Sequence, residues 1–179
     1  MKMNMKKPVL SLALFLAALL LFAGCGKNAA DIDSSSAEAA AENEAAFTFS
    51  TVDIEGNAVD MSDYGDAKVI MVNLWEPWCP PCKAEMPDIQ KLYDEYKDEG
   101  FVVLGVYSSD DHGSAEEVVR EYSITYPILR STDSFAAFET QYVPTTFFVD
   151  GSGNVLSDES YIGAKSYEEW ESIVLSYLS

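Results

Sequence analysis

The chain has 179 residues, of which 48% are hydrophobic and 12% aromatic, so it contains enough apolar material for one core of ordinary domain size. Lys and Arg number 11 against 30 Asp and Glu, which gives a net charge of −19 at pH 7. An acidic surface repels phosphate backbones and anionic lipid headgroups, so the composition argues against nucleic-acid binding and against electrostatic adsorption to membranes.

Residues 1–24 predict a secretory signal peptide. Three lysines near the N-terminus precede an apolar run at 9–23, which ends in small residues before Cys25. The run is shorter than a typical transmembrane helix and lies close to the N-terminus, so it is not expected to be a permanent membrane span. We therefore expect an exported protein.

The sequence Leu21-Phe22-Ala23-Gly24-Cys25 resembles the lipobox of bacterial lipoproteins. Phe22 departs from the Leu, Val or Ile that most often stands three residues before the lipidated cysteine. The resemblance implies that Cys25 is lipidated. Lipid chains contribute about 0.8 kcal/mol per buried methylene and would hold even an acidic domain at a membrane. The alternatives are ordinary cleavage, which leaves a free thiol at Cys25, and an uncleaved anchor; both place the domain outside the cytoplasm. Residues 25–46, rich in Ala, Ser and Glu, predict a solvated tether.

Residues 47–179 begin with a predicted hairpin, a strand and a helix. Two alternating runs, 47–52 and 57–61, flank a turn that contains glycine. The nearly continuous apolar run 68–75 is typical of a central strand covered on both faces. From Cys82 to Gly100 apolar residues recur at spacings of three and four, which predicts an amphipathic helix.

The following segments predict a mixed set of strands and helices. They are a strand at 101–107, a helix at 114–122 capped by Ser114 with Glu117 three residues on, a shorter helix at 133–140, a hairpin of 145–149 with 154–160, and a helix at 166–178 with Ser166 and Glu169 as a capping box. The element order predicts an α/β fold in which helices flank a mixed central sheet.

Cys79 and Cys82 stand where the buried strand gives way to the helix. Unpaired N–H groups at a helix N-terminus favour a thiolate at Cys79, and the spacing lets Cys82 resolve a mixed disulfide. A structural disulfide closing so short a loop would stabilise little. A zinc site lacks ligands, since only His112 and Cys25 remain, and covalent haem attachment needs a histidine where Lys83 stands. The pattern therefore favours redox exchange, with no metal.

Three separated motifs resemble the TlpA/ResA branch of thioredoxin-like proteins over residues 47–179. They are Trp75-Glu76-Pro77-Trp78-Cys79-Pro80-Pro81-Cys82, then Glu85-Met86-Pro87, then Val143-Pro144-Thr145-Thr146 followed by Phe147-Phe148-Val149-Asp150. The resemblance implies a thioredoxin-like fold with an N-terminal β-hairpin and a central α/β insertion.

The resemblance also implies roles for individual residues. Cys79 matches the nucleophile and Cys82 the resolving thiol. Pro144 matches a cis-proline whose preceding backbone pairs with a client; the alternative is a trans proline that starts an edge strand. The residues expected against a bound client are Trp78, Val143, Pro144 and Thr145.

Glu85 lies one helical turn after Cys82, where similar proteins have an active-site carboxylate. If Glu85 is partly buried, its pKa rises and it can take the proton that Cys82 must lose. The alternative is an exposed glutamate favoured by the helix dipole. Asn73 stands where cytoplasmic thioredoxins have a buried aspartate, which leaves Glu85 as the nearest candidate base.

Two residues depart from the family pattern. Glu76 replaces a usually small residue and adds negative charge near Cys79, and Tyr142 stands where relatives often have glycine. The partner choice is therefore open. His112 is interpreted as a solvated loop residue without a role.

By resemblance, the expected function is a lipid-anchored thiol-disulfide oxidoreductase on the extracytoplasmic face of the cell membrane. It would receive electrons from a membrane donor of the CcdA/DsbD type and reduce clients such as apocytochromes c or methionine sulfoxide reductases. The Cys79–Cys82 pair would need no further cofactor. The alternatives are a thiol peroxidase, whose usual pattern requires Thr or Ser at the position of Glu76, and a non-catalytic binding lipoprotein.

Overall fold

The computed structural model describes residues 46–179. The predicted signal peptide, Cys25 and residues 26–45 of the predicted tether lie outside the described residues. None of the described helices is long and apolar enough to cross a membrane.

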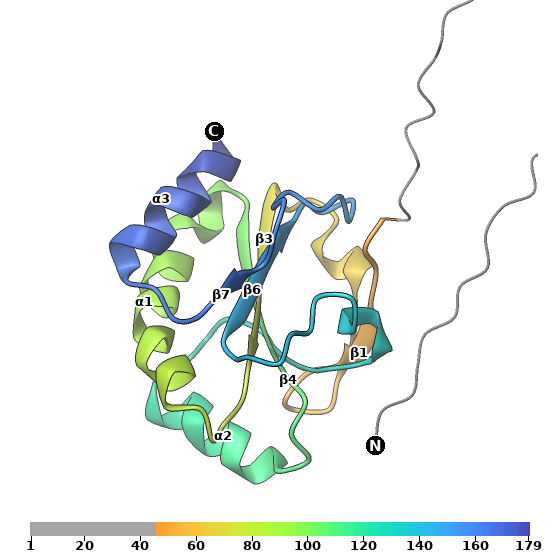
Figure 1. Ribbon diagram of the computed structural model, residues 1–179. Helices are drawn as coiled ribbons and strands as arrows, with labels where there is room; N and C mark the ends of the chain where they lie inside the picture. Colours follow the sequence, from red (N-terminus) through yellow and green to blue (C-terminus); the bar gives the residue numbers. More distant parts are fainter. Residues whose placement is uncertain (1–45) are drawn as a thin grey trace, which may run out of the picture. The chain divides into compact units, whose positions relative to one another are not determined.

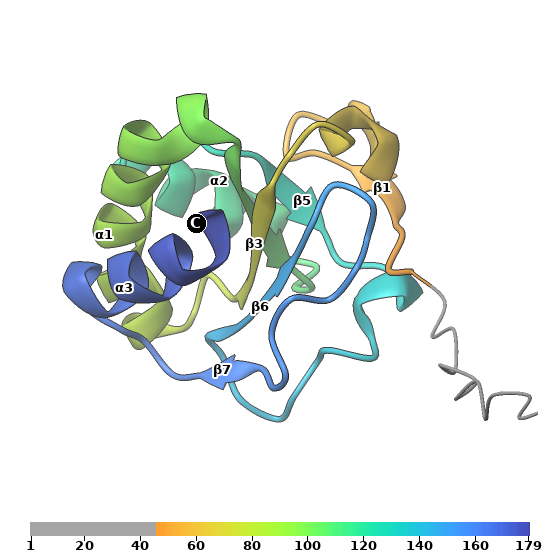
Figure 2. The ribbon, with the colours of Figure 1, turned by 90° about the horizontal axis from the view of Figure 1, so that it is seen from above.

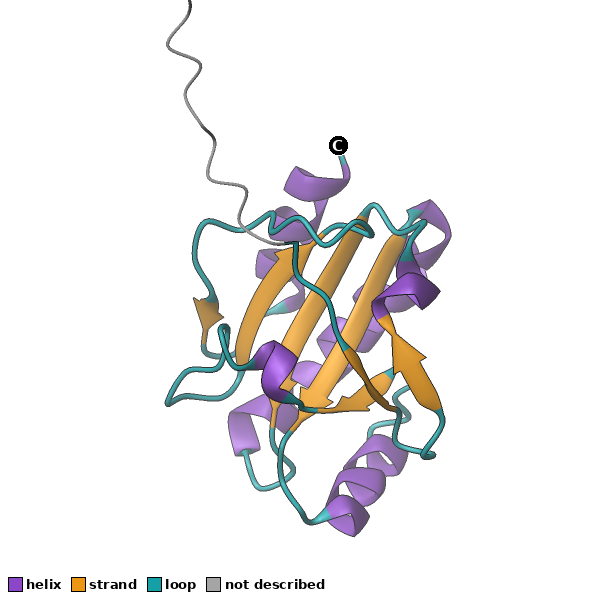
Figure 3. Ribbon diagram, turned by 90° about the vertical axis from the view of Figure 1, so that its right-hand side faces the viewer, coloured by secondary structure: helices purple, strands orange, loops and turns teal. Residues whose placement is uncertain are grey.

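A five-stranded mixed sheet forms the centre of the domain (Figure 3). Its order is β5 (Ile128–Arg130), β4 (Phe101–Tyr107), β3 (Val69–Trp75), β6 (Thr145–Val149) and β7 (Tyr161–Ile162). The first three strands are parallel, and β6 and β7 are antiparallel to their neighbours. All seven residues of β3 are buried, as predicted from the apolar run.

Three helices cover one face of this sheet, as Figures 1 and 2 show. They are α1 (Pro80–Tyr96), α2 (His112–Glu121) and α3 (Tyr167–Leu178). The core beneath them includes Met71, Phe148 and Trp170 as well as both cysteines of the pair. This helix-side core therefore surrounds the chemistry that the sequence predicts.

The other face is covered by the N-terminal hairpin, β1 (Ser50–Val52) with β2 (Ala58–Asp60), and by short 3-10 turns (Figure 2). The turns are η1 (Met61–Tyr64) and η3 (Asp133–Phe135); a third, η2 (Lys97–Glu99), follows α1. Aromatic rings of Phe47, Phe49, Phe135 and Phe147 dominate this hairpin-side core. The hairpin, the α2–β5 insertion between β4 and β6, and the thioredoxin-like α/β arrangement are confirmed.

Local signals place the ends of α1 and α3. Helix α1 begins at Pro80, two residues before the prediction, because Cys79 is its N-cap. After η2, Gly100 takes a φ of 96°, a left-handed conformation that glycine adopts without strain. The predicted capping box at the start of α3, formed by Ser166 and Glu169, is confirmed.

The prediction that Ser114 caps α2 is wrong. The carboxylate of Asp111 accepts from both the N–H and the hydroxyl of Ser114, so the helix begins at His112. His112 is exposed but does not lie in a loop, and its Nδ1 is 2.5 Å from the hydroxyl oxygen of Tyr107.

Two further predictions fail because side chains outweigh the local pattern. The segment 133–140 forms only the turn η3, since Phe135 is buried against Phe49 and Phe138 stacks on Phe147. The segment 154–160 pairs with β6 only through a bridge at Val155. There the hydroxyl of Ser157, in place of a backbone carbonyl, accepts a hydrogen bond from the N–H of Phe148. The strand that pairs with β6 is instead β7, which follows this segment.

Candidate active site

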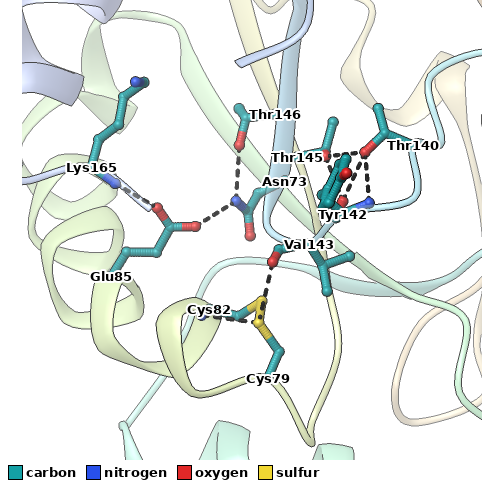
Figure 4. Close-up of a disulfide and its surroundings, with 10 residues drawn as sticks. All are labelled: Asn73, Cys79, Cys82, Glu85, Thr140, Tyr142, Val143, Thr145, Thr146 and Lys165. Atoms are coloured by element: carbon teal, nitrogen blue, oxygen red, sulfur yellow. Dashed lines mark hydrogen bonds between the residues drawn. A yellow bond between two sulfur atoms is a disulfide. The ribbon is translucent and has the colours of Figure 1, made fainter. Parts of the chain in front are cut away.

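Cys79 and Cys82 form a disulfide at the N-terminus of α1 (Figure 4). Their sulfurs are 2.09 Å apart and their Cα atoms 5.4 Å apart. Pro80 and Pro81 occupy the first helical positions, where a backbone N–H would have no intrahelical acceptor. The N–H of Cys82 donates to Sγ of Cys79 over 3.2 Å. The pair thus lies where N–H groups and the helix dipole favour a thiolate.

Both cysteines are buried, while two aromatic side chains near them are open to solvent. Cys79 is 2% exposed and Cys82 is 1% exposed, whereas Trp78 and Tyr142 are 68% and 64% exposed. The difference between the cysteines is too small to rank their accessibility. The assignment of Cys79 as the attacking thiol therefore stays a prediction.

The peptide bond between Val143 and Pro144 is cis, as the family resemblance implied. The carbonyl oxygen of Val143 lies 3.6 Å from Sγ of Cys79 (Figure 4). Thr145 is fully buried, and its hydroxyl donates to the carbonyl oxygen of Tyr142 over 2.7 Å. Val143 is thus the residue of this loop whose backbone faces the sulfur, while the side chain of Thr145 maintains the shape of the loop.

Glu85 projects from α1 into the helix-side core, which excludes the alternative of an exposed surface glutamate. Its Oε1 accepts from Nδ2 of Asn73 at 3.0 Å, and its Oε2 accepts from the N–H of Lys165 at 3.1 Å (Figure 4). Oε2 also accepts from Nε1 of Trp170 at 3.2 Å. Burial raises the pKa of this carboxyl, although the hydrogen bonds and the Lys165 charge oppose the shift.

Within residues 46–179, no hydrogen bond joins Glu85 to either sulfur. Figure 4 shows the carboxylate directed toward Asn73 and Lys165. Proton transfer between Glu85 and Cys82 would therefore pass through a bridging water or a conformational change.

Glu76 has a role that the sequence did not reveal. The side chain is 7% exposed, its Oε1 accepts from the N–H and the hydroxyl of Ser108, and its Oε2 accepts from the N–H of Ser109. The carboxylate thereby ties the loop before Cys79 to the loop that follows β4. Its partners lie 32 and 33 residues away in the sequence, where no local pattern points to them.

In the part of the chain that the structure describes, no group of three or more His, Cys, Asp or Glu side chains is placed to hold a metal ion.

A protein-family model described as the AhpC/TSA family matches residues 43–157, which include the cysteine pair and the cis-proline. The chain belongs to the AhpC/TSA family. The match also spans Glu76 and Glu85, so the polar groups described above lie within the family region.

This AhpC/TSA chain is similar to proteins named thiol-disulfide oxidoreductase ResA. It is 28% identical over 125 residues to that of Bacillus cereus, which covers 69% of this chain and 70% of the relative. It is 34% identical over 109 residues to that of Geobacillus kaustophilus, with coverage of 60% and 62%. The resemblance to the TlpA/ResA branch is confirmed.

The fold also matches a crystal structure of a thiol:disulfide interchange protein, a thioredoxin family protein, from Chlorobium tepidum. The TM-score is 0.67 at 26% sequence identity, and the match covers 75% of this chain and 95% of that one. The thioredoxin-like fold of the AhpC/TSA chain is confirmed.

We expect Glu76→Gln to lower the free energy of unfolding of this AhpC/TSA protein by about 1–2 kcal/mol. An amide can accept hydrogen bonds only at its oxygen, so its NH2 group would face a donor of Ser108 or Ser109. Urea denaturation of the oxidised protein measures the loss. The control Glu117→Gln, at an exposed position of α2, should change stability by less than about 0.5 kcal/mol. Equal stability of the two variants would contradict the role of Glu76.

Proposed function

We propose that this chain is an extracytoplasmic, membrane-anchored thiol-disulfide oxidoreductase that reduces the disulfides of exported proteins. The observation that carries the proposal is the Cys79–Cys82 disulfide at the N-terminus of α1, with the carbonyl of Val143 against Cys79. The names of the ResA relatives support the same chemistry. In its dithiol form the cysteine pair holds the two electrons that reduction requires.

The reaction consists of two thiol-disulfide exchanges. The thiolate of Cys79 attacks one sulfur of the client disulfide, and the other client sulfur leaves and takes a proton. Cys82 then loses its proton and attacks Sγ of Cys79, which releases the second client thiol. The client gains two electrons and the dithiol loses two, so the disulfide in this structure is the product state.

Glu85 is the proposed acceptor of the Cys82 proton. It lies one turn away on the same helix, and its raised pKa brings it closer to the range in which it can both accept and release a proton. The Trp78 side chain and the Val143–Pro144 backbone would contact the client while the mixed disulfide exists. Thr145 would contribute through its backbone, since its side chain is buried.

The location rests on the first 46 residues of the sequence. Signal cleavage before Cys25, lipidation of that cysteine and a tether to residue 46 would hold the domain at the outer face of the cell membrane. A membrane donor of the CcdA/DsbD type would return the pair to the dithiol. The clients would be exported proteins such as apocytochromes c or methionine sulfoxide reductases.

The small number of N–H groups near Cys79 favours a reductant over an oxidant. Because Pro80 and Pro81 have no N–H, the hydrogen bond from Cys82 is the one that reaches its sulfur among the described residues. A weakly stabilised thiolate makes the disulfide harder to reduce and the dithiol a better donor. We expect a reduction potential below about −200 mV, measured by equilibration in glutathione or dithiothreitol buffers. A value near −120 mV would contradict the proposal, because such a protein would oxidise its clients.

A further inference from the structure

A hollow of about 100 Å³ opens next to Val143, at the edge of the sheet where the parallel strands β3 and β4 end. This is the edge at which open α/β sheets commonly bind ligands. The volume exceeds the roughly 30 Å³ that one water molecule occupies in the liquid. We call this space the acidic hollow; it is lined by Leu74, Glu76, Val106, Glu139, Tyr142 and Val143, among others.

The acidic hollow adjoins the reactive sulfur through Val143. Val143 lines the space, and its carbonyl oxygen is 3.6 Å from Sγ of Cys79. A client segment that runs along this backbone would therefore place a side chain close to the hollow while its cysteine is at Cys79.

The wall next to Val143 is held in place by hydrogen bonds. The hydroxyl oxygens of Thr140 and Thr145 lie 2.8 and 2.7 Å from the carbonyl oxygen of Tyr142, and Oγ1 of Thr140 also accepts the N–H of Tyr142 (Figure 4). The hollow is thus preformed before a client arrives, which lowers the cost of binding.

The charge in the hollow is negative and lacks a cation. Glu76 and Glu139 both line it, and among the described residues no lysine or arginine forms an ion pair with either. Arg130 is engaged by the carbonyl oxygen of Ser109 and by Asp110. The carboxylate of Glu139 is exposed and accepts one hydrogen bond, from Ser131. The Glu139 carboxylate therefore retains oxygen acceptors that a cationic group could use.

Two lining residues are the positions at which this sequence departs from the TlpA/ResA pattern. Glu76 and Tyr142 come from loops more than 60 residues apart, yet both line the same hollow. This convergence favours a recognition role that belongs to this chain in particular.

We propose that the acidic hollow binds a lysine or arginine side chain that flanks the client cysteine, so that this protein prefers basic client segments. The inference rests on the proposed reductase function, and the exchange steps are unchanged. A cation would pair with Glu139 and be attracted by the buried charge of Glu76, which gives specificity and a faster encounter at low salt.

The test uses three peptides, each with one disulfide, in which the residues flanking the attacked cysteine are Lys, Gln or Glu. The reduced wild-type protein is mixed with each peptide, and the second-order rate of single-turnover oxidation is followed by tryptophan fluorescence. Each rate is divided by the rate with dithiothreitol, because flanking charge also alters the reactivity of the peptide cysteine. The variants are Glu139→Gln and Glu139→Lys. The matched controls are Glu121→Gln and Glu121→Lys, at an exposed position at the far end of α2.

We expect the wild type to prefer the Lys peptide over the Glu peptide by about tenfold at low salt, and less in 1 M salt. Glu139→Gln should reduce this ratio about threefold, and Glu139→Lys should reverse it, while both Glu121 variants keep it. If the wild type reduces all three peptides equally, or if the Glu139 and Glu121 variants behave alike, the hollow does not select charge and this inference is wrong, while the reductase function stands. Failure to reduce any peptide or a small disulfide would instead overturn the proposed function, and this inference with it.

Discussion

Replacement of Cys79 by serine is expected to abolish disulfide reduction and leave only the rate of dithiothreitol itself in an insulin-reduction assay. A serine hydroxyl is not ionised near neutral pH, and the thiolate is the attacking species. We expect that Cys82 cannot substitute, because its proposed role is the resolving step and a single remaining thiol has no partner with which to form the intramolecular disulfide. Equal rates for Cys79→Ser and the wild type would favour the binding lipoprotein without catalysis.

The matched variant Cys82→Ser should behave differently. Its Cys79 can still attack, but no resolving thiol follows, so a mixed disulfide with the client should accumulate and appear as a mass increase under non-reducing conditions. Brief alkylation of the reduced wild type near neutral pH should label Cys79 first. Preferential labelling of Cys82 would reverse the two roles.

We expect Glu85→Gln to slow disulfide exchange by about 10²-fold and to change its pH profile, because the variant loses the proposed proton acceptor. The amide can be accommodated. In the wild type, Nδ2 of Asn73 donates both to Glu85 and to the Thr146 hydroxyl. If the Asn73 amide rotates by a half turn in the variant, its oxygen can accept from the new NH2 group and from the Thr146 hydroxyl. Stopped-flow rates between pH 5 and 9 measure the effect, with the exposed Glu168→Gln as control. A profile identical to the wild type would remove Glu85 from the mechanism.

The same variant should alter the pH dependence of stability. Burial raises the pKa of Glu85, so the folded protein holds this proton more tightly than the unfolded chain. The stabilisation linked to the proton is present below the unfolded pKa and is lost as the pH rises through the raised folded pKa. As the pH rises from the unfolded-state pKa of Glu85 to its higher folded-state pKa, the wild type should therefore lose stability relative to Glu85→Gln. Above the folded-state pKa the difference in stability should stay constant. Urea denaturation at several pH values tests the sign.

The sequence predicts those elements whose pattern is local. Strand β3 is a continuous apolar run, and the cysteine pair is recognisable because a buried strand precedes it and a periodic helix follows. The start of α3 is readable because both halves of its capping box lie within four residues.

The sequence does not predict the parts of the structure that depend on contacts between residues far apart in the chain. Segment 133–140 has helical spacing, but Phe135 and Phe138 are fixed by rings from other parts of the chain. Glu85 could be selected from its spacing, whereas its donors at Lys165 and Trp170 lie 80 and 85 residues away. The contacts of Glu76 with Ser108 and Ser109 exist only once β3 and β4 are paired.

The sheet separates two apolar cores, and only the helix-side core includes Cys79 and Cys82. A change such as Phe135→Leu falls in the other core. It should therefore change the free energy of unfolding without changing the residues packed around the sulfurs. Stability and reactivity can therefore be adjusted independently in this molecule. Substitutions that repack the aromatic half can therefore raise or lower the stability of the fold while the residues packed around the disulfide stay the same.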